Sequence, residues 1–188
     1  CGFDPGDATY MIGSDTYLNS GSLRAARLAA GAAAQATRAV LDGEVDNAFC
    51  AVRPPGHHAE IGTPMGFCFF NSVAIAAATA LERDDIERVA ILDIDVHHCN
   101  GTVDIFKDRP EVLVCSSFQD NFYPLRYLTF ENDHVLNTPL SAGSDGSEFR
   151  RGIDARWWQR IQSFQPDLIL LSAGFDAHLE DDIAGLRL

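Results

Sequence analysis

The sequence predicts an α/β domain in which helices cover both faces of a central parallel sheet. Short, continuous apolar segments alternate along the chain with segments of helical composition. Strands without polar alternation are typical of parallel sheets, because both faces of such a sheet are buried. The chain has 188 residues, of which 46% are hydrophobic, which is enough for a sizeable core. We therefore expect residues 1–188 to form a single domain.

Four segments carry the signals of helices. Residues 20–43 combine a serine at the start, which suits an N-cap, with dense alanine and a glycine stop. Asn71 is expected to cap a second helix over 72–83. A short helix is expected near 102–107, and a longer one over 147–164.

Four apolar segments are expected to form buried strands: 47–52, 88–95, 111–116 and 167–176. A loop rich in proline and glycine follows the first of them. The segment 117–146 has no clear periodicity and is longer than the usual connection between elements. It is expected to be an irregular loop that is either functional or mobile.

The charge and the cysteines narrow the classes of partner and compartment. With 14 basic and 27 acidic residues the net charge is -13, which disfavours nucleic acid and tolerates a cationic partner, although simple solubility is the more common reason for such a charge. Five cysteines without a C-x-x-C pair or a signal peptide favour a reduced, cytoplasmic setting. No apolar run approaches the roughly 20 residues that span a bilayer, so no membrane association is expected. The sequence is also compatible with a homo-oligomer.

Polar clusters follow the expected strands at their carboxyl ends, where ligands bind in sheets of this kind. "RPPGHH" follows the first strand, "DIDVHH" ends the second, Ser116 ends the third and "SAGFDAH" ends the fourth. Four of the six histidines stand in two adjacent pairs within these clusters. Solvated histidines in loops are the simpler interpretation, but this placement favours a functional site.

The strand that ends in "DIDVHH" predicts a metal site. Side chains alternate along a strand, so Asp93, Asp95 and His97 lean to one side while His98 leans to the other and is expected to be structural. Asp95 and His97, with an oxygen from Asp176, would make a three-ligand zinc site with one open position. A lone carboxylate at a strand end is more often a cap or a loop hydrogen bond, and Asp93 suits that role.

The motifs "RPPGHHA", "GFCFFN", "ILDIDVHHCNGT" and "SAGFDAH", in this order, resemble the zinc-dependent histone deacetylase superfamily. That superfamily includes acetylpolyamine amidohydrolases and acetoin-utilisation proteins. "RPPGHH" with "HHCNGT" is closer to its class II and bacterial branch. The resemblance implies a three-layer, arginase-like fold, and a domain that lacks its N-terminal start and the C-terminal region with a Gly-Gly-Tyr motif.

The resemblance also assigns roles in catalysis. The residues in the positions of the zinc ligands are Asp95, His97 and Asp176. His58 matches the general base that deprotonates the catalytic water, and His57 matches its electrostatic partner or proton donor. Asp93 matches the carboxylate that orients His57. Asn100 occupies the position facing His58 where class I members carry aspartate, and a neutral amide would raise the pKa of His58 less than a carboxylate.

The same resemblance places a substrate tunnel and a second cation. Phe67 and Tyr123 match the aromatic walls of an acyl-lysine tunnel, although aromatic residues are more often part of a core. Gly66 would offer its backbone carbonyl to the substrate amide, and Asp15 would grip the substrate backbone at the rim. A structural potassium ion would be held by main-chain oxygens around Asp93, Asp95 and His97 with the hydroxyl of Ser116.

These roles imply a zinc amidohydrolase that removes an acetyl or other acyl group from an acetylated lysine peptide or an acetylpolyamine. A non-catalytic module that binds acyl-lysine is one alternative. A binuclear manganese ureohydrolase of the same fold is another, although only one metal's set of ligands is visible.

Two departures from the family pattern stand out. Cys99 replaces a glycine that would permit an unusual backbone angle, and it is interpreted either as a small buried residue or as a reactive thiol near zinc. "DNFYPLRY" at 120–127 lacks the Pro-Gly turn expected after the aromatic wall, which leaves specificity open.

Overall fold

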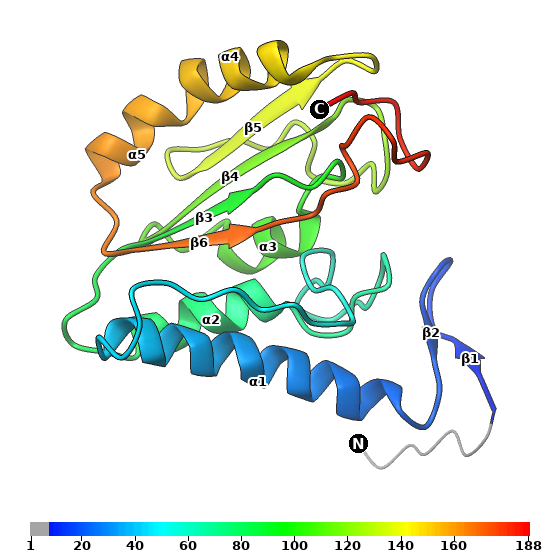
Figure 1. Ribbon diagram of the computed structural model, residues 1–188, viewed down its shortest axis with the longest axis horizontal. Helices are drawn as coiled ribbons and strands as arrows, with labels where there is room; N and C mark the ends of the chain where they lie inside the picture. The colour runs from blue at the N-terminus through cyan, green and yellow to red at the C-terminus, as the bar shows by residue number, and fades with distance from the viewer. Residues whose placement is uncertain (1–7) are drawn as a thin grey trace.

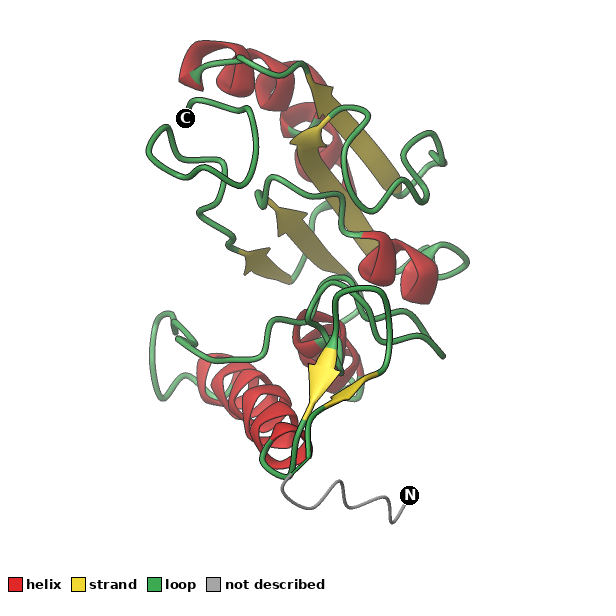
Figure 2. Ribbon diagram, turned by 90° about the vertical axis from the view of Figure 1, so that its right-hand side faces the viewer, coloured by secondary structure: helices red, strands yellow, loops and turns green. Residues whose placement is uncertain are grey.

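The computed structural model describes residues 8–188 and has the three layers that the sequence predicts (Figures 1 and 2). Four parallel strands form the sheet in the order β5-β4-β3-β6. Helices α2 (Ser72–Leu81) and α3 (Asn100–Phe106) cover one face, and α1 (Ser22–Leu41) packs outside α2. Helices α4 (Gly146–Arg156) and α5 (Trp158–Phe164) cover the other face.

Three strands of the sheet are those that the apolar segments predict. They are β3 (Val89–Asp93), β4 (Val112–Gln119) and β6 (Leu168–Ser172). Side chains that alternate along β3 and β4 enter two different cores. Val89 and Ile91 pack with α2 and α3, whereas Ala90 packs with Trp157 on the opposite face. The sheet is therefore buried on both sides at its centre, which explains the continuous apolar sequence.

The fourth strand, β5 (Val135–Leu140), lies in the segment that was expected to be an irregular loop. Its sequence contains Asn137 and Pro139, and proline is tolerated only where a strand does not need every ladder hydrogen bond. β5 meets this condition because it lies at an edge of the sheet. The prediction of a loop over all of 117–146 was wrong for this reason.

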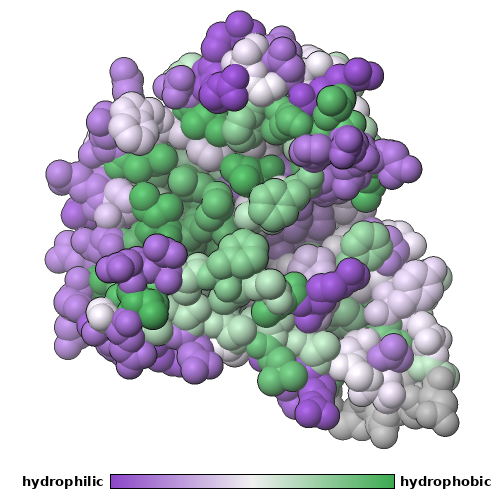
Figure 3. All heavy atoms as spheres, in the orientation of Figure 1, coloured by the Kyte–Doolittle hydropathy of each residue, from purple (hydrophilic) through white to green (hydrophobic). Residues whose placement is uncertain are grey.

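The expected strand at 47–52 is also wrong. These residues form no strand, and all but one of them are exposed. They lie opposite β6, the other edge strand among the described residues, and line a groove with it. Ile169 and Leu171 of β6 are 51% and 56% exposed, and Figure 3 shows apolar side chains gathered over this part of the molecule. Without a hydrogen-bonded neighbour, the apolar segment at 47–52 does not take up strand geometry.

The helix predictions hold with small changes. Asn71 caps α2 by accepting a hydrogen bond from the amide of Ala74 at 3.0 Å, as predicted. The expected serine cap of α1 is wrong, because the N-cap is Gly21 and no side chain caps this end. The expected helix over 147–164 is divided at Trp157, whose buried indole donates to the hydroxyl of Thr138 at 2.9 Å.

Two further elements, besides β5, were not predicted from the sequence. β1 (Tyr10–Met11) and β2 (Tyr17–Leu18) form a small antiparallel hairpin, and strands of two residues are too short to leave a pattern.

Among the described residues, 8–188, no helix is both long and apolar enough to cross a membrane.

Candidate active site

The polar clusters meet at the carboxyl edge of the sheet, as parallel strands require. In the register of the strands, Asp93 at the end of β3 lies between Ser116 of β4 and Ser172 of β6. The segment 94–99 continues from β3, and 173–178 continues from β6. These two segments run side by side, joined by the amide of Val96, which donates to the carboxylate of Asp176 at 3.0 Å.

Asp95, His97 and Asp176 form a compact group of possible metal ligands. One ligand atom from each residue lies within 4.8 Å of the others. Nδ1 of His97 lies 2.9 Å from Oδ1 of Asp95 and 3.0 Å from Oδ2 of Asp176. Burial alone would lower the pKa of His97, but the hydrogen bonds to Asp176 and Asp95 raise it to about 9. Burial opposes ionisation of Asp95, yet the charge on His57 and hydrogen bonds from His97 hold its pKa below the usual range.

Gly174 positions Asp95 by its lack of a side chain. A Cβ atom on Gly174 would stand 2.0 Å from Oδ2 and 2.5 Å from Cγ of Asp95. Only glycine fits at this point, because real Cβ atoms essentially never come closer than 3.0 Å to another non-bonded heavy atom. Sequence reasoning missed this role, and the only signal was a glycine within "SAGFD".

His57 lies beside the metal group and is buried. Its Nδ1 is 3.0 Å from Oδ2 of the buried Asp93, and its Nε2 is 3.7 Å from Oδ2 of Asp95. Burial would lower the pKa of His57, but the carboxylates of Asp95 and Asp93 outweigh it and raise the pKa to about 9. Asp93 makes the expected loop hydrogen bond, since its Oδ1 accepts from the amide of Asp95 at 3.2 Å, and its Oδ2 also contacts His57.

His58 has a different environment although it is the next residue. Its Nδ1 lies 2.7 Å from Oδ1 of Asn100, the first residue of α3. Burial, followed by the charge on His57, lowers the pKa of His58 to about 3. The amide of Asn100 in turn donates to Glu60 at 2.7 Å, and Glu60 pairs with Arg126 at 3.0 Å. Neither Glu60 nor Arg126 was singled out from the sequence.

The four residues expected to form the substrate tunnel are close together. Gly66 and Phe67 both have positive φ, 56° and 65°, and a Cβ on Gly66 would stand 2.2 Å from the His58 ring. The amide of Gly66 donates to Asp15 at 3.0 Å. The ring of Tyr123 lies edge-on to that of His58, with centroids 5.1 Å apart. Phe67 is 56% exposed, so it belongs to the rim and not to a core.

The groups around Tyr123 extend this wall. Its hydroxyl is buried, and burial together with the neighbouring Asp15 raises the pKa of Tyr123 well above its usual range. The carbonyl of Gly66 accepts a hydrogen bond from the thiol of Cys68 at 3.2 Å. Phe122, which sequence reasoning missed, stacks on His97 with ring centroids 5.3 Å apart and planes 20° from parallel.

Cys99 has φ of -80° and ψ of 56°, and because φ is negative the position does not require glycine, so the expectation of glycine-like geometry was wrong. The residue is fully buried in the core, and burial raises the pKa of its thiol well above the usual range. This environment favours a small buried residue over a reactive thiol. The hydroxyl of Ser116 accepts a hydrogen bond from the amide of Cys99 at 3.4 Å. The ring of His98 is hydrogen-bonded to the side chain of Asn137, away from the metal group.

Comparison with known proteins identifies the family. The model of the histone deacetylase domain matches residues 4–188. The chain belongs to the histone deacetylase family. It is 40% identical to the histone deacetylase-like amidohydrolase of Pseudomonas aeruginosa over 94% of this chain and 48% of that protein. It is 41% identical to histone deacetylase clr3 of Schizosaccharomyces pombe over 92% of this chain and 27% of that protein.

A solved structure of the family has the same fold. The HD domain of HDA15 superimposes with a TM-score of 0.90 at 37% identity, over 95% of this chain and 55% of that chain. The three-layer deacetylase fold expected from the sequence is therefore confirmed. The chain spans about half the length of the Pseudomonas aeruginosa relative.

Proposed function

We propose that the chain carries the catalytic centre of a zinc-dependent amidohydrolase that removes an acetyl or other acyl group from an acylated amine. The observation that carries the proposal is the arrangement of Asp95, His97 and Asp176 beside two histidines with different hydrogen-bond partners. Relatives named histone deacetylase and histone deacetylase-like amidohydrolase support this class of reaction.

The three candidate ligands suit zinc. Nitrogen and oxygen ligands at about 2.0–2.2 Å around a tetrahedral ion lie about 3.3 Å from one another. The separations of 2.9 Å and 3.0 Å from His97 to the two carboxylates need only a small expansion to reach this value. Three protein ligands leave one position open, as in catalytic zinc sites. When bound, zinc would polarise an amide carbonyl and make water more acidic.

The two histidines would divide the proton transfers. Because Nδ1 of His58 faces the oxygen of Asn100, its Nε2 is left to accept a proton from the attacking water. Nδ1 of His57 faces the carboxylate of Asp93, which favours the protonated ring and suits it to donate a proton to the leaving amine. The fixed ring positions come from buried partners, since Asp93 and Asn100 are both fully buried.

The wall residues would select the acyl chain. Phe67 and Tyr123 would flank a narrow, neutral substituent, while the carbonyl of Gly66 would accept from the substrate amide and Asp15 would bind the substrate backbone. The substrates proposed are an acetylated lysine peptide or an acetylpolyamine, both compatible with the charge of -13. A potassium ion near Asp93 and Ser116 and a cytoplasmic location are part of the same proposal.

The decisive experiment measures zinc content and amide hydrolysis together in the natural, full-length protein. We expect one zinc per chain, and hydrolysis of an acetyl-lysine peptide or an acetylpolyamine that is lost by about 100-fold or more in His58→Ala. His134→Gln is the matched control, since His134 is buried against the carbonyl of Phe106 in a different part of the domain. A His58→Ala enzyme with unchanged hydrolysis would refute the mechanism.

The same measurements separate the alternatives. Tight binding of a hydroxamate without hydrolysis would favour a binding module. Two metal ions per chain would favour the binuclear ureohydrolase, although residues 8–188 contain one group of three possible ligands.

A further inference from the structure

We propose that Glu60 is a positioning residue for His58: it holds the amide of Asn100 in the one orientation that leaves Nε2 of His58 free to accept a proton. The inference rests on the proposed function, because it assigns His58 the role of general base. Asn100 stands between Glu60 and His58, accepting its hydrogen-bond contact with His58 through Oδ1 and donating to Glu60 through Nδ2, so the effect of Glu60 passes through Asn100.

The first step is the asymmetry of the amide. A primary amide has one end that accepts hydrogen bonds and one that only donates, whereas a carboxylate only accepts. Nδ2 of Asn100 lies 2.7 Å from Oε1 of Glu60, and Oδ1 lies 2.7 Å from Nδ1 of His58. Turning the amide over would place its oxygen against the carboxylate of Glu60 and lose that hydrogen bond. Nδ2 also approaches the carbonyl of His58 at 3.4 Å and the sulfur of Met65 at 3.3 Å. Glu60 is the nearest of these three acceptors, so it contributes most to fixing which end of Asn100 faces the histidine.

The second step is the tautomer of the neutral imidazole. A neutral imidazole carries one proton, and the partner of one nitrogen decides the state of the other. Oδ1 of Asn100 requires a hydrogen on Nδ1 of His58, so Nε2 keeps its lone pair. If the amide were reversed, its NH2 group would donate to Nδ1, and the proton would move to Nε2. A His58 ring in that state has no free site to accept a proton from water.

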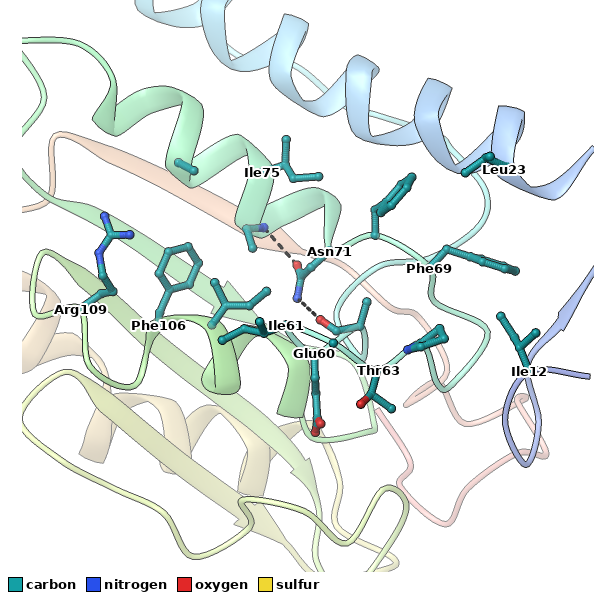
Figure 4. Close-up of a pocket in the computed structure, with 17 residues that line it drawn as sticks. Ile12, Leu23, Glu60, Ile61, Thr63, Phe69, Asn71, Ile75, Phe106 and Arg109 are labelled. Carbon is teal, nitrogen blue, oxygen red and sulfur yellow. Dashed lines mark hydrogen bonds between the residues drawn. The ribbon is translucent and has the colours of Figure 1, made fainter. Parts of the chain in front are cut away.

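The third step is how the side chain of Glu60 is accommodated in this position. The side chain of Glu60 is only 5% exposed, and that of Asn100 is fully enclosed. Figure 4 shows Glu60 at the border of an apolar pocket, with its carboxylate directed away from Ile61 and Ile75. A buried charge needs a partner, and Arg126 supplies it at 3.0 Å from Oε2.

Arg126 connects the series of contacts from His58 through Asn100 and Glu60 to the wall of the proposed tunnel. It lies in the segment 120–127, three residues after Tyr123, whose ring contacts His58. Nδ2 of Asn100 also approaches the sulfur of Met65 at 3.3 Å. Position 100 carries an amide and not a carboxylate, but the carboxylate of Glu60 lies one hydrogen bond further from His58. There it orients Asn100, the partner of the His58 ring, instead of contacting the ring itself.

The test compares Glu60→Ala with Glu60→Gln in the zinc-loaded, full-length protein, with Glu44→Ala on the exposed surface as control. Nitrogen-15 NMR of the histidine side chains reports the tautomer of His58, and steady-state kinetics on an acetyl-lysine peptide report kcat and KM separately. In Glu60→Ala we expect the Nε2-protonated tautomer to appear and kcat to fall about tenfold or more, with KM little changed.

Glu60→Gln should behave like the wild type within about threefold. Its side-chain oxygen still accepts from Asn100, since Arg126 is 47% exposed and can turn to solvent. This rescue excludes a loss that comes only from an altered fold. Wild-type tautomer and kcat in Glu60→Ala, or an equal loss in Glu60→Gln, would overturn the inference. A wild-type protein without zinc-dependent hydrolysis would instead overturn the proposed function, while the NMR comparison would still test the orientation of His58.

Discussion

Gly174→Ala should weaken zinc binding severely, although Gly174 is not a ligand. The new Cβ would stand 2.0 Å from Oδ2 and 2.5 Å from Cγ of Asp95. An ordinary non-bonded contact between carbon and oxygen is about 3.2 Å, so the carboxylate must retreat by roughly 1 Å. Zinc sites tolerate only about 0.2 Å in ligand distance. The displacement is several times larger, so one of the three proposed ligands would be lost.

The size of the effect follows from the ligand count. Changing a residue that merely orients a ligand typically lowers metal affinity about 10- to 100-fold. Because Gly174→Ala displaces the ligand itself, we expect a loss of about 100-fold or more, equivalent to about 3 kcal/mol. Competition with a chromophoric chelator measures the dissociation constant directly. Thermal unfolding of the metal-free variant shows whether the fold is retained.

Gly62→Ala is the matched control. No atom lies within 4 Å of the position of its Cβ, so zinc affinity should remain at the wild-type value. A Gly174→Ala protein that folds and binds zinc within threefold of the wild type would refute the steric reasoning. It would also place Asp95 outside the metal site.

Three further predictions concern stability, measured as the free energy of unfolding in urea. Gly31→Ala in the exposed interior of α1 should stabilise by about 1 kcal/mol, because nothing lies near the new methyl group; destabilisation would contradict this. Asp145→Ala should cost about 1 kcal/mol by removing the capping box of α4, and an unchanged value would count against the cap. Burial lowers the pKa of His98 from 6.5 to about 4, so the unfolded chain binds the proton more tightly. Stability should therefore fall by about 3 kcal/mol as the pH drops through this range, and His98→Gln should abolish that part of the slope.

The sequence predicted those parts of the fold that are written in local patterns. β3, β4 and β6 are apolar runs because both faces of the central sheet are buried. The cap at Asn71 is local, because the side chain of Asn71 accepts from the amide of Ala74 only three residues later. Polar residues at the ends of these strands likewise indicated where a site would form.

Edge elements were predicted poorly because their outcome depends on neighbours. The apolar segment 47–52 was expected to be a buried strand, yet all but one of its residues are exposed. β5 forms despite Pro139 because β4 offers it a parallel partner. Whether such segments become strands is decided by pairing, which a local pattern does not contain.

The sequence by itself determined the fold class, the family and the identities of the residues that could hold a metal and move a proton. Each of these depends on residue type and on order along the chain. Only the tertiary structure showed that Gly174 makes room for Asp95, and that Glu60 reaches an amide 40 residues away while pairing with Arg126. Contacts of this kind join segments that are distant in sequence, and packing brings them within the few ångströms over which steric exclusion and hydrogen bonds act.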